Sequence, residues 1–213
     1  MAMPTEIAYE DALNSPDAEE WNAVMTKEHD TLVRQKTWDL VPLPPGRKAI
    51  PGRFVLVIKD TDPPIKKARW VAKGFHQRHG EDYLETYANT VNPVIIRLLL
   101  AYAALYGWEI MQWDVVSAFT CAPLNEEIYM VQPTGFKQKG SEDLVCKLNK
   151  ALYGLKQSAR AWEHYLRGLL AKLDIIPLKS DQSVYISTSG TLIVLLTHVN
   201  DIIVLSLDNE RIR

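Results

Sequence analysis

Residues 191–206, with the sequence TLIVLLTHVNDIIVLS, constrain the fold of this chain more than any other stretch. Two apolar runs, residues 192–196 and 202–205, flank the short segment His-Val-Asn-Asp. Both runs are rich in β-branched side chains and bounded by polar residues, which predicts two buried strands. Because Asn and Asp tolerate turn geometry, we expect a β-hairpin with Asp201 at its tip.

A carboxylate at a hairpin tip is costly unless it is solvated, paired or bound to a cation. Asp114, which ends the apolar stretch WEIMQWD at residues 108–114, is the best candidate for a second acid beside Asp201. Two acids on neighbouring strands could hold Mg²⁺, and a two-metal site stabilises the attacking and leaving oxygens in phosphoryl transfer. On spacing alone, two solvated turn carboxylates are the more common explanation.

Composition limits the function classes. The 213 residues suffice for one large domain or two small ones, and the net charge of −2 means that any nucleic-acid site must be a local basic patch. Cys121 and Cys146 are too few for a disulfide framework, so we expect reduced thiols in an intracellular protein of the cytoplasm, with the nucleus as the alternative. No apolar run is long enough to span a bilayer, and the N-terminus lacks a signal-peptide pattern. We therefore expect no membrane partner.

The N-terminal half of the sequence predicts one helix and one basic hairpin. Residues 1–14 are polar and predicted to be loose, and Ser15 and Pro16 open a helix. The stretches RFVLVIK and ARWVAKG, within residues 53–74, predict two strands that carry the strongest basic cluster of the chain.

The rest of the sequence predicts an α+β arrangement. Asn92 and Pro93 begin a second helix that ends near Gly107 and is apolar nearly all round, so we expect it to be buried on most sides. From Trp108 onward the order is strand, helix, strands, helix, strands. This order is typical of an antiparallel sheet with helices on one face.

Several motifs then occur in register over most of the chain: KARWVAKGF at residues 67–75, WEIMQWDV at 108–115, EIYM at 127–130, QPTGF at 132–136 and LYGLKQ at 152–157. Together they make the sequence similar to the reverse transcriptases of copia-type LTR retrotransposons. The resemblance implies a right-hand polymerase with a ferredoxin-like antiparallel palm sheet. It implies the fingers at residues 15–107 and the palm at 108–213, ending after the catalytic hairpin without a thumb.

The resemblance also implies roles for individual residues. Asp114 and Asp201 would be catalytic and bind two Mg²⁺ ions, with Asn200 at the position of a further catalytic acid. The implied nucleotide contacts are Arg69 and Lys73 to the triphosphate, Phe119 as the aromatic gate that excludes a 2′-hydroxyl, and Gln157 beside the incoming nucleotide. Each has a structural alternative: Phe119 could be a core aromatic, Gln157 a polar residue at a helix start, and Arg69 and Lys73 a solvated strand face.

The departures from the family pattern concern activity. Where the family has a paired Asp-Asp, this chain has Asn200-Asp201, which predicts a weakly active or inactive polymerase. The family's thumb and RNase H domains would have to come from the polyprotein or from a dimer partner. We therefore expect a polyprotein fragment that binds RNA or DNA template–primer and dNTPs. A non-catalytic nucleic-acid-binding or assembly module, or an inert remnant, is the alternative.

Overall fold

The computed structural model describes residues 5–208, which form two compact units. The first unit combines residues 5–84 with 119–158, and the second combines 85–118 with 159–208. The chain therefore passes from one unit to the other near residues 84, 118 and 158. Residues 1–4 of the predicted loose N-terminus and residues 209–213 of the predicted palm lie outside the described residues.

Two antiparallel sheets form the first unit. One has the order β1-β3-β4 and the other β2-β7-β6. The elements of this unit are β1 (Thr5–Ile7), α1 (Tyr9–Leu13), α2 (Ala18–Arg34), β2 (Trp38–Val41), β3 (Gly52–Lys59), β4 (Ile65–Ala72), the 3₁₀-helix η1 (Gly74–His76), α4 (Ala118–Cys121, which begins at the unit boundary), β6 (Tyr129–Met130) and β7 (Val145–Leu148).

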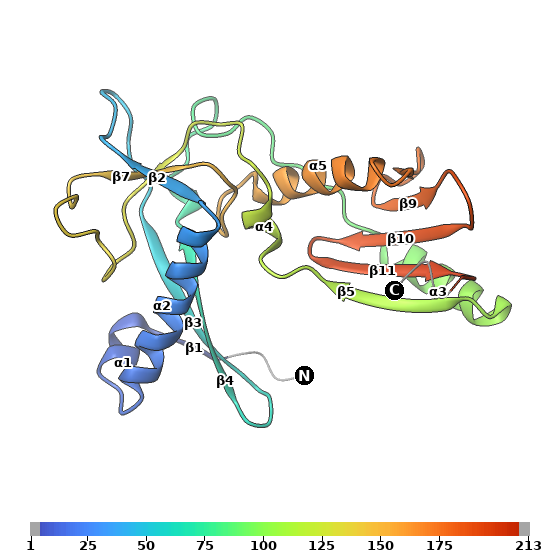
Figure 1. The fold of residues 1–213 in the computed structure, drawn as a ribbon, viewed down its shortest axis with the longest axis horizontal. Helices are drawn as coiled ribbons and strands as arrows, with labels where there is room; N and C mark the ends of the chain where they lie inside the picture. The colour runs from blue at the N-terminus through green and yellow to red at the C-terminus, as the bar shows by residue number, and fades with distance from the viewer. Residues whose placement is uncertain (1–4, 209–213) are drawn as a thin grey trace. The chain divides into compact units, whose positions relative to one another are not determined.

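Helix α2 packs along the long β3–β4 hairpin, as Figure 1 shows. Its buried residues Trp21, Met25 and Leu32 recur at helical spacing and join the same core as Trp70 of β4. The predicted strands of the basic hairpin are confirmed, with all eight residues of β3 paired to β4.

The N-terminal prediction was wrong for the residues that the structure describes. β1 pairs with β3, and α1 buries Ala12 completely. Ala12 joins the same core, and Ile7, Tyr9 and Leu13 pack against it, so the segment is ordered by apolar side chains as well as by backbone pairing. Helix α2 also begins later than expected: Asp17 is its N-cap, and the Ser15 hydroxyl accepts a hydrogen bond from the Asp17 backbone N–H.

A five-stranded antiparallel sheet organises the second unit (Figure 1). Its order is β5-β11-β10-β9-β8, so the mixed helix and antiparallel-sheet class expected from the sequence is confirmed. The elements are α3 (Pro93–Tyr106), β5 (Glu109–Asp114), α5 (Ser158–Ala171), β8 (Ile175–Pro177), β9 (Val184–Ser187), β10 (Ile193–His198) and β11 (Asp201–Ser206).

The two ends of α3 are where its sequence predicts them, but the burial of the helix differs from the prediction. The Asn92 side chain accepts a hydrogen bond from the Val94 backbone N–H, and Gly107 ends the helix with a φ of 68°. One face packs on Val194, Leu196 and Leu205 of the sheet. The opposite face is exposed, so burial on most sides was a wrong prediction; its large apolar residues are Val94, Leu98, Tyr102, Leu105 and Tyr106. Across residues 5–208, no helix combines the length and apolarity needed to cross a membrane.

Candidate active site

The predicted hairpin forms in the second unit. β10 and β11 pair in register from Ile193 opposite Ser206 to His198 opposite Asp201, leaving Val199 and Asn200 as the two-residue loop. Asp201 therefore lies at the first position of the returning strand, as its place in the turn segment predicts.

Asp114 lies directly opposite Asp201, because β5 pairs with the outer edge of β11. Residues in this relationship have Cβ atoms about 5 Å apart, and two like charges there destabilise a sheet. Asp114 is exposed and Asp201 is partly exposed. The facing of two carboxylates is thus unfavourable for folding alone and favourable for binding a cation.

Each of these two carboxylates accepts a hydrogen bond from a side-chain amide. The Asn200 amide nitrogen donates to Asp114 Oδ1, and the Gln112 amide nitrogen donates to Asp201 Oδ1 over 3.4 Å. Within residues 5–208 no group of three His, Cys, Asp or Glu side chains could hold a metal. The donor set fits one divalent cation between two acids, whereas a second ion has no third carboxylate to balance its charge.

The hairpin tip is held from α5. Val199 has a φ of 57°, which is uncommon for a β-branched residue, and its carbonyl oxygen accepts a 2.6 Å hydrogen bond from the Trp162 indole N–H. In the sequence, the helical spacing of Trp162, Leu166 and Leu170 predicts only that Trp162 faces inward. Nothing in the sequence pairs it with residue 199, which is 37 positions away.

The first unit contains the four residues implied to contact the nucleotide, and two of them meet through a third side chain. The Arg69 guanidinium carbon lies 4.7 Å from the centroid of the Tyr153 ring, and the Phe119 ring lies edge-on to the same ring at 5.0 Å. Arg69, Tyr153 and Phe119 are therefore one contiguous cluster. Tyr153 was not singled out from the sequence, although it belongs to the LYGLKQ motif, which was its only signal.

Gln157 is only 2% exposed. Its carbonyl oxygen accepts a 2.9 Å hydrogen bond from the Gln77 amide, and its own amide nitrogen donates to the Asp82 carbonyl oxygen over 2.9 Å. The Gln77 carbonyl oxygen in turn accepts from the Lys156 backbone N–H. As folded, the Gln157 amide connects the start of α5 to the segment after β4.

Lys73 follows β4 and is partly exposed, with its backbone N–H donating to the Pro51 carbonyl oxygen. The next residue, Gly74, lies against Gly154: a Cβ at position 74 would be 2.0 Å from the Gly154 carbonyl oxygen. The KARWVAKGF and LYGLKQ motifs are therefore in direct backbone contact. Glycine is needed at both positions because no side-chain atom fits between the two backbones.

Two cations of the basic hairpin form ion pairs with nearby acids. Arg53 forms a 2.7 Å ion pair with Glu6, and Lys66 pairs with both Asp17 and Glu20 at 2.7 and 2.6 Å. Arg53 and Lys66 thus help to hold β1 and α2 to the hairpin.

The family model described as reverse transcriptase (RNA-dependent DNA polymerase) matches residues 35–213. The chain is 40% identical over 198 residues to the Retrovirus-related Pol polyprotein from transposon RE1 of Arabidopsis thaliana, covering 91% of this chain. It is 36% identical over 203 residues to the Pol polyprotein from transposon TNT 1-94 of Nicotiana tabacum, covering 93%.

A more distant match is the Ty1-BL Gag-Pol polyprotein of Saccharomyces cerevisiae, 29% identical over 176 residues that cover 79% of this chain. The chain spans 14% and 15% of the length of the two plant polyproteins and 10% of the yeast one.

Proposed function

Because the chain belongs to the reverse transcriptase family, in the copia-type branch that its motifs resemble, we propose that it is an RNA-directed DNA polymerase domain with its reaction centre at Asp114 and Asp201. The observation that carries this proposal is the register that sets the two carboxylates opposite each other. The centre belongs to the palm, and the basic hairpin belongs to the fingers. RNA or DNA template–primer and dNTPs are the proposed substrates.

Asp114 and Asp201 would hold Mg²⁺, the hard cation that carboxylate and phosphate oxygens prefer. When bound, the metal supplies Lewis-acid stabilisation of the attacking and leaving oxygens. The chain's own contribution begins with position: pairing of β5 with β11 holds the Asp114 carboxylate in place, and the Trp162 hydrogen bond to Val199 fixes the tip that carries Asp201.

The nucleotide contacts follow from the first unit. Arg69 is a fork-shaped donor suited to phosphate oxygens, and its stacking on Tyr153 restricts where the guanidinium points. Lys73 would add a point charge. Phe119, whose ring is oriented by Tyr153, would pack against the sugar and exclude a 2′-hydroxyl.

For Gln157 we propose an indirect role. Its amide is buried and engaged with Gln77 and Asp82, so it would order the segment after Lys73 rather than touch the nucleotide. This role would keep Lys73 in the position from which it contacts the triphosphate.

Asn200 leaves this centre short of negative charge. Two divalent ions carry four positive charges. The chain supplies two carboxylates, and Asn200 lies at the position where a third carboxylate would be. Metal stabilisation is worth several kcal/mol and about 1.4 kcal/mol is tenfold in rate, so the loss amounts to a factor on the order of 10³. We therefore propose weak activity or none in the natural sequence.

Primer extension on an RNA template with Mg²⁺ and dNTPs tests this function. We expect the Asn200→Asp variant of the full chain to extend primers on the order of 10³ times faster than the natural sequence. Asn125→Asp is the matched control, because it makes the same change at an exposed asparagine of the first unit.

A third variant, Asn200→Asp combined with Asp114→Asn, should abolish the gain. Equal rates for the natural chain and Asn200→Asp would contradict the charge argument. Salt-sensitive template binding without extension by any variant would favour a non-catalytic binding module.

A further inference from the structure

Helix α3 is apolar on two opposite faces, and the sheet of the second unit covers only one of them. The covered face contributes Ile95, Ile96, Leu99 and Leu100 to the core. On the exposed face of α3, the five large apolar side chains are 46–76% exposed. Together they present roughly 600 Å² to solvent, and exposed apolar patches of this size mark interaction sites. Because a helix that is apolar all round is normally buried, the exposed face of α3 calls for a partner.

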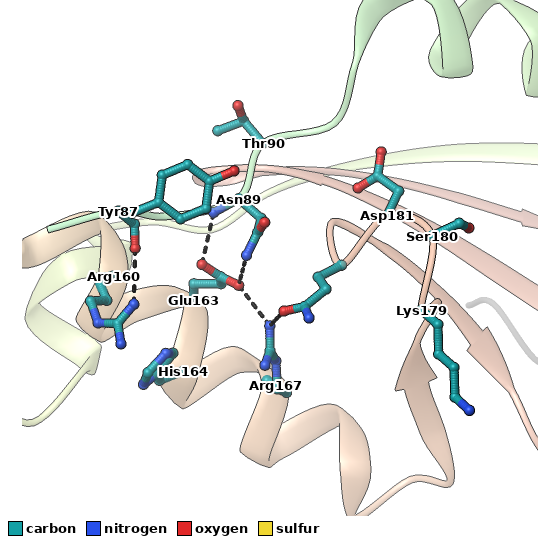
Figure 2. A pocket seen from close by; sticks show the side chains of 11 residues that line it. Tyr87, Asn89, Thr90, Arg160, Glu163, His164, Arg167, Lys179, Ser180 and Asp181 are labelled. Carbon is teal, nitrogen blue, oxygen red and sulfur yellow. Dashed lines mark hydrogen bonds and ion pairs between the residues drawn. The ribbon is translucent and has the colours of Figure 1, made fainter. Parts of the chain in front are cut away.

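The segment before α3 is held firmly to the rest of its unit. The backbone N–H and the side-chain amide of Asn89 donate to the two carboxylate oxygens of Glu163 in α5, at 2.8 and 2.7 Å (Figure 2). Two residues further on, the Val91 backbone N–H donates to the Thr197 carbonyl oxygen of β10 over 3.2 Å. The start of α3 is therefore fixed before any partner binds, which lowers the entropy cost of association.

The spacing of residues on the exposed face is that of a helix–helix contact. Val94, Leu98, Ala101 and Leu105 follow one another at intervals of four, three and four residues, and all four are exposed. This is the spacing of the a and d positions of a heptad, whose side chains fit between those of a facing helix. A second helix is thus the complementary partner.

The exposed face is also complementary to itself. Helix α3 spans Pro93–Tyr106, so its midpoint lies between residues 99 and 100. A second α3 running antiparallel about that midpoint places Val94 opposite Leu105 and Leu98 opposite Ala101. Large residues then face small ones at the centre, which permits close packing. A parallel pair would instead set Ala101 opposite Ala101 and leave a gap there.

The charge on α3 fits the same antiparallel arrangement. Arg97 is the only charged residue in the sequence of this helix, and it would lie opposite Tyr102 of the second copy. The Tyr102 ring lies 4.4 Å from the Tyr106 ring and edge-on to Trp108 at 5.7 Å, so its orientation is restricted. It is still 46% exposed, which leaves room for a guanidinium over the ring.

We propose that the exposed face of α3 binds the same face of a second copy of this chain, in an antiparallel pair with the twofold axis at the helix midpoint. A contact between identical faces closes with two subunits, so it forms a dimer and not a filament. The two copies bury on the order of 1,200 Å², at the lower limit of stable specific interfaces, which makes the dimer reversible.

Sedimentation velocity of the full chain over a series of concentrations, without template, dNTP or metal, tests the dimer. We expect a reversible monomer–dimer equilibrium. Leu98→Glu should raise the dissociation constant at least tenfold, because it places a carboxylate from each copy at the centre of the apolar contact. Leu173→Glu is the matched control: Leu173 is 68% exposed, Leu98 is 66% exposed, and both belong to the second unit. It should leave the equilibrium unchanged.

Crosslinking tests the antiparallel arrangement without a charge change. Val94→Cys and Leu105→Cys are made separately in a chain in which the partly exposed Cys121 is replaced by Ser. In the proposed pair residue 94 faces residue 105, whereas the two residues numbered 105 lie about 16 Å apart along the helix axis. A short bis-maleimide should therefore link the two variants when they are mixed and link neither variant to itself.

The inference is wrong if the natural chain is a monomer at every concentration, in which case something other than a second copy covers the face. It is also wrong if Leu98→Glu and Leu173→Glu behave alike, if association continues beyond the dimer, or if each cysteine variant links to itself and the mixture gives no additional product. These measurements use no substrate, so failure of the proposed polymerase function would not change them.

Discussion

The indole N–H of Trp162 donates a 2.6 Å hydrogen bond to the carbonyl oxygen of Val199, which joins α5 to the tip of the β10–β11 hairpin. Val199 and Asn200 are the whole loop between the two strands, and Val199 has a positive φ. A β-branched residue persists in this conformation only where its surroundings stabilise it.

Replacing Trp162 by Phe should therefore loosen the hairpin tip. The change keeps an aromatic ring but leaves the part-buried Val199 carbonyl without its donor, which costs about 1–3 kcal/mol. Urea unfolding should show that loss, and hydrogen exchange should accelerate at residues 197–202. Trp113→Phe makes the same change at an exposed site of the same unit, and we expect a change of stability within about 0.5 kcal/mol. Similar losses in both variants would contradict the role given to Trp162.

Gly154 should tolerate no side chain. Its φ is 87°, and a Cβ there would lie 2.1 Å from the Ala72 carbonyl oxygen. Gly46 is a natural control because its φ is 79° but nothing lies within 4 Å of its Cβ position. We expect Gly46→Ala to cost about 1–2 kcal/mol from backbone strain alone. Gly154→Ala should cost about 3 kcal/mol or more, because the clash of the new Cβ with the Ala72 carbonyl oxygen adds to the backbone strain. Equal costs in chemical denaturation would mean that the backbone contact is unimportant.

Because of Glu28, the free energy of unfolding of the protein should decrease as pH rises through the acidic range. Burial raises the pKa of this carboxyl above its ordinary value of 4.5, although the Trp70 backbone N–H and the charges of Arg69 and Lys67 oppose that rise. Between 4.5 and the raised pKa the folded state binds more protons than the unfolded state, so the free energy of unfolding falls with increasing pH.

Glu28→Gln keeps an acceptor for Trp70 and removes the buried charge. It should therefore be more stable than the natural chain at pH 7, with the difference disappearing below pH 4.5. Glu19→Gln, at an exposed position of the same helix, should show no such pattern in parallel urea titrations. A Glu28→Gln variant that is less stable at pH 7 would show that attraction to Arg69 and Lys67 outweighs burial.

The two cysteines should differ in reactivity. Burial raises the pKa of Cys146 to about 12, and its side chain is almost fully covered, whereas Cys121 is partly exposed. Because the thiolate is the nucleophile, iodoacetamide at pH 8 should modify Cys121 in the folded protein and leave Cys146 unmodified. Mass spectrometry of peptides gives the measurement, and modification of both thiols in denaturant is the control. Rapid labelling of Cys146 under native conditions would contradict its burial.

Local patterns in the sequence predicted those elements whose formation depends on residues close to one another in the chain. The hairpin follows from two β-branched runs around an Asn-Asp turn, and α3 follows from Asn92 at its start and Gly107 at its end. Predictions failed where a long-range partner decides the outcome. β1 is a strand only because β3 pairs with it, and α3 exposes an apolar face because the sheet covers one side of it.

The sequence by itself determined the hairpin and the family motifs and predicted Asp114 and Asp201 as a pair, because turn chemistry and strand periodicity act over a few residues. Only the tertiary structure decided that Asp114 lies opposite Asp201, since strand register between residues 87 positions apart depends on the whole sheet. It likewise decided that Gly74 contacts Gly154, that Tyr153 joins Arg69 to Phe119, and that Gln157 is buried. Contacts of this kind come from packing, and no local pattern of residues encodes them.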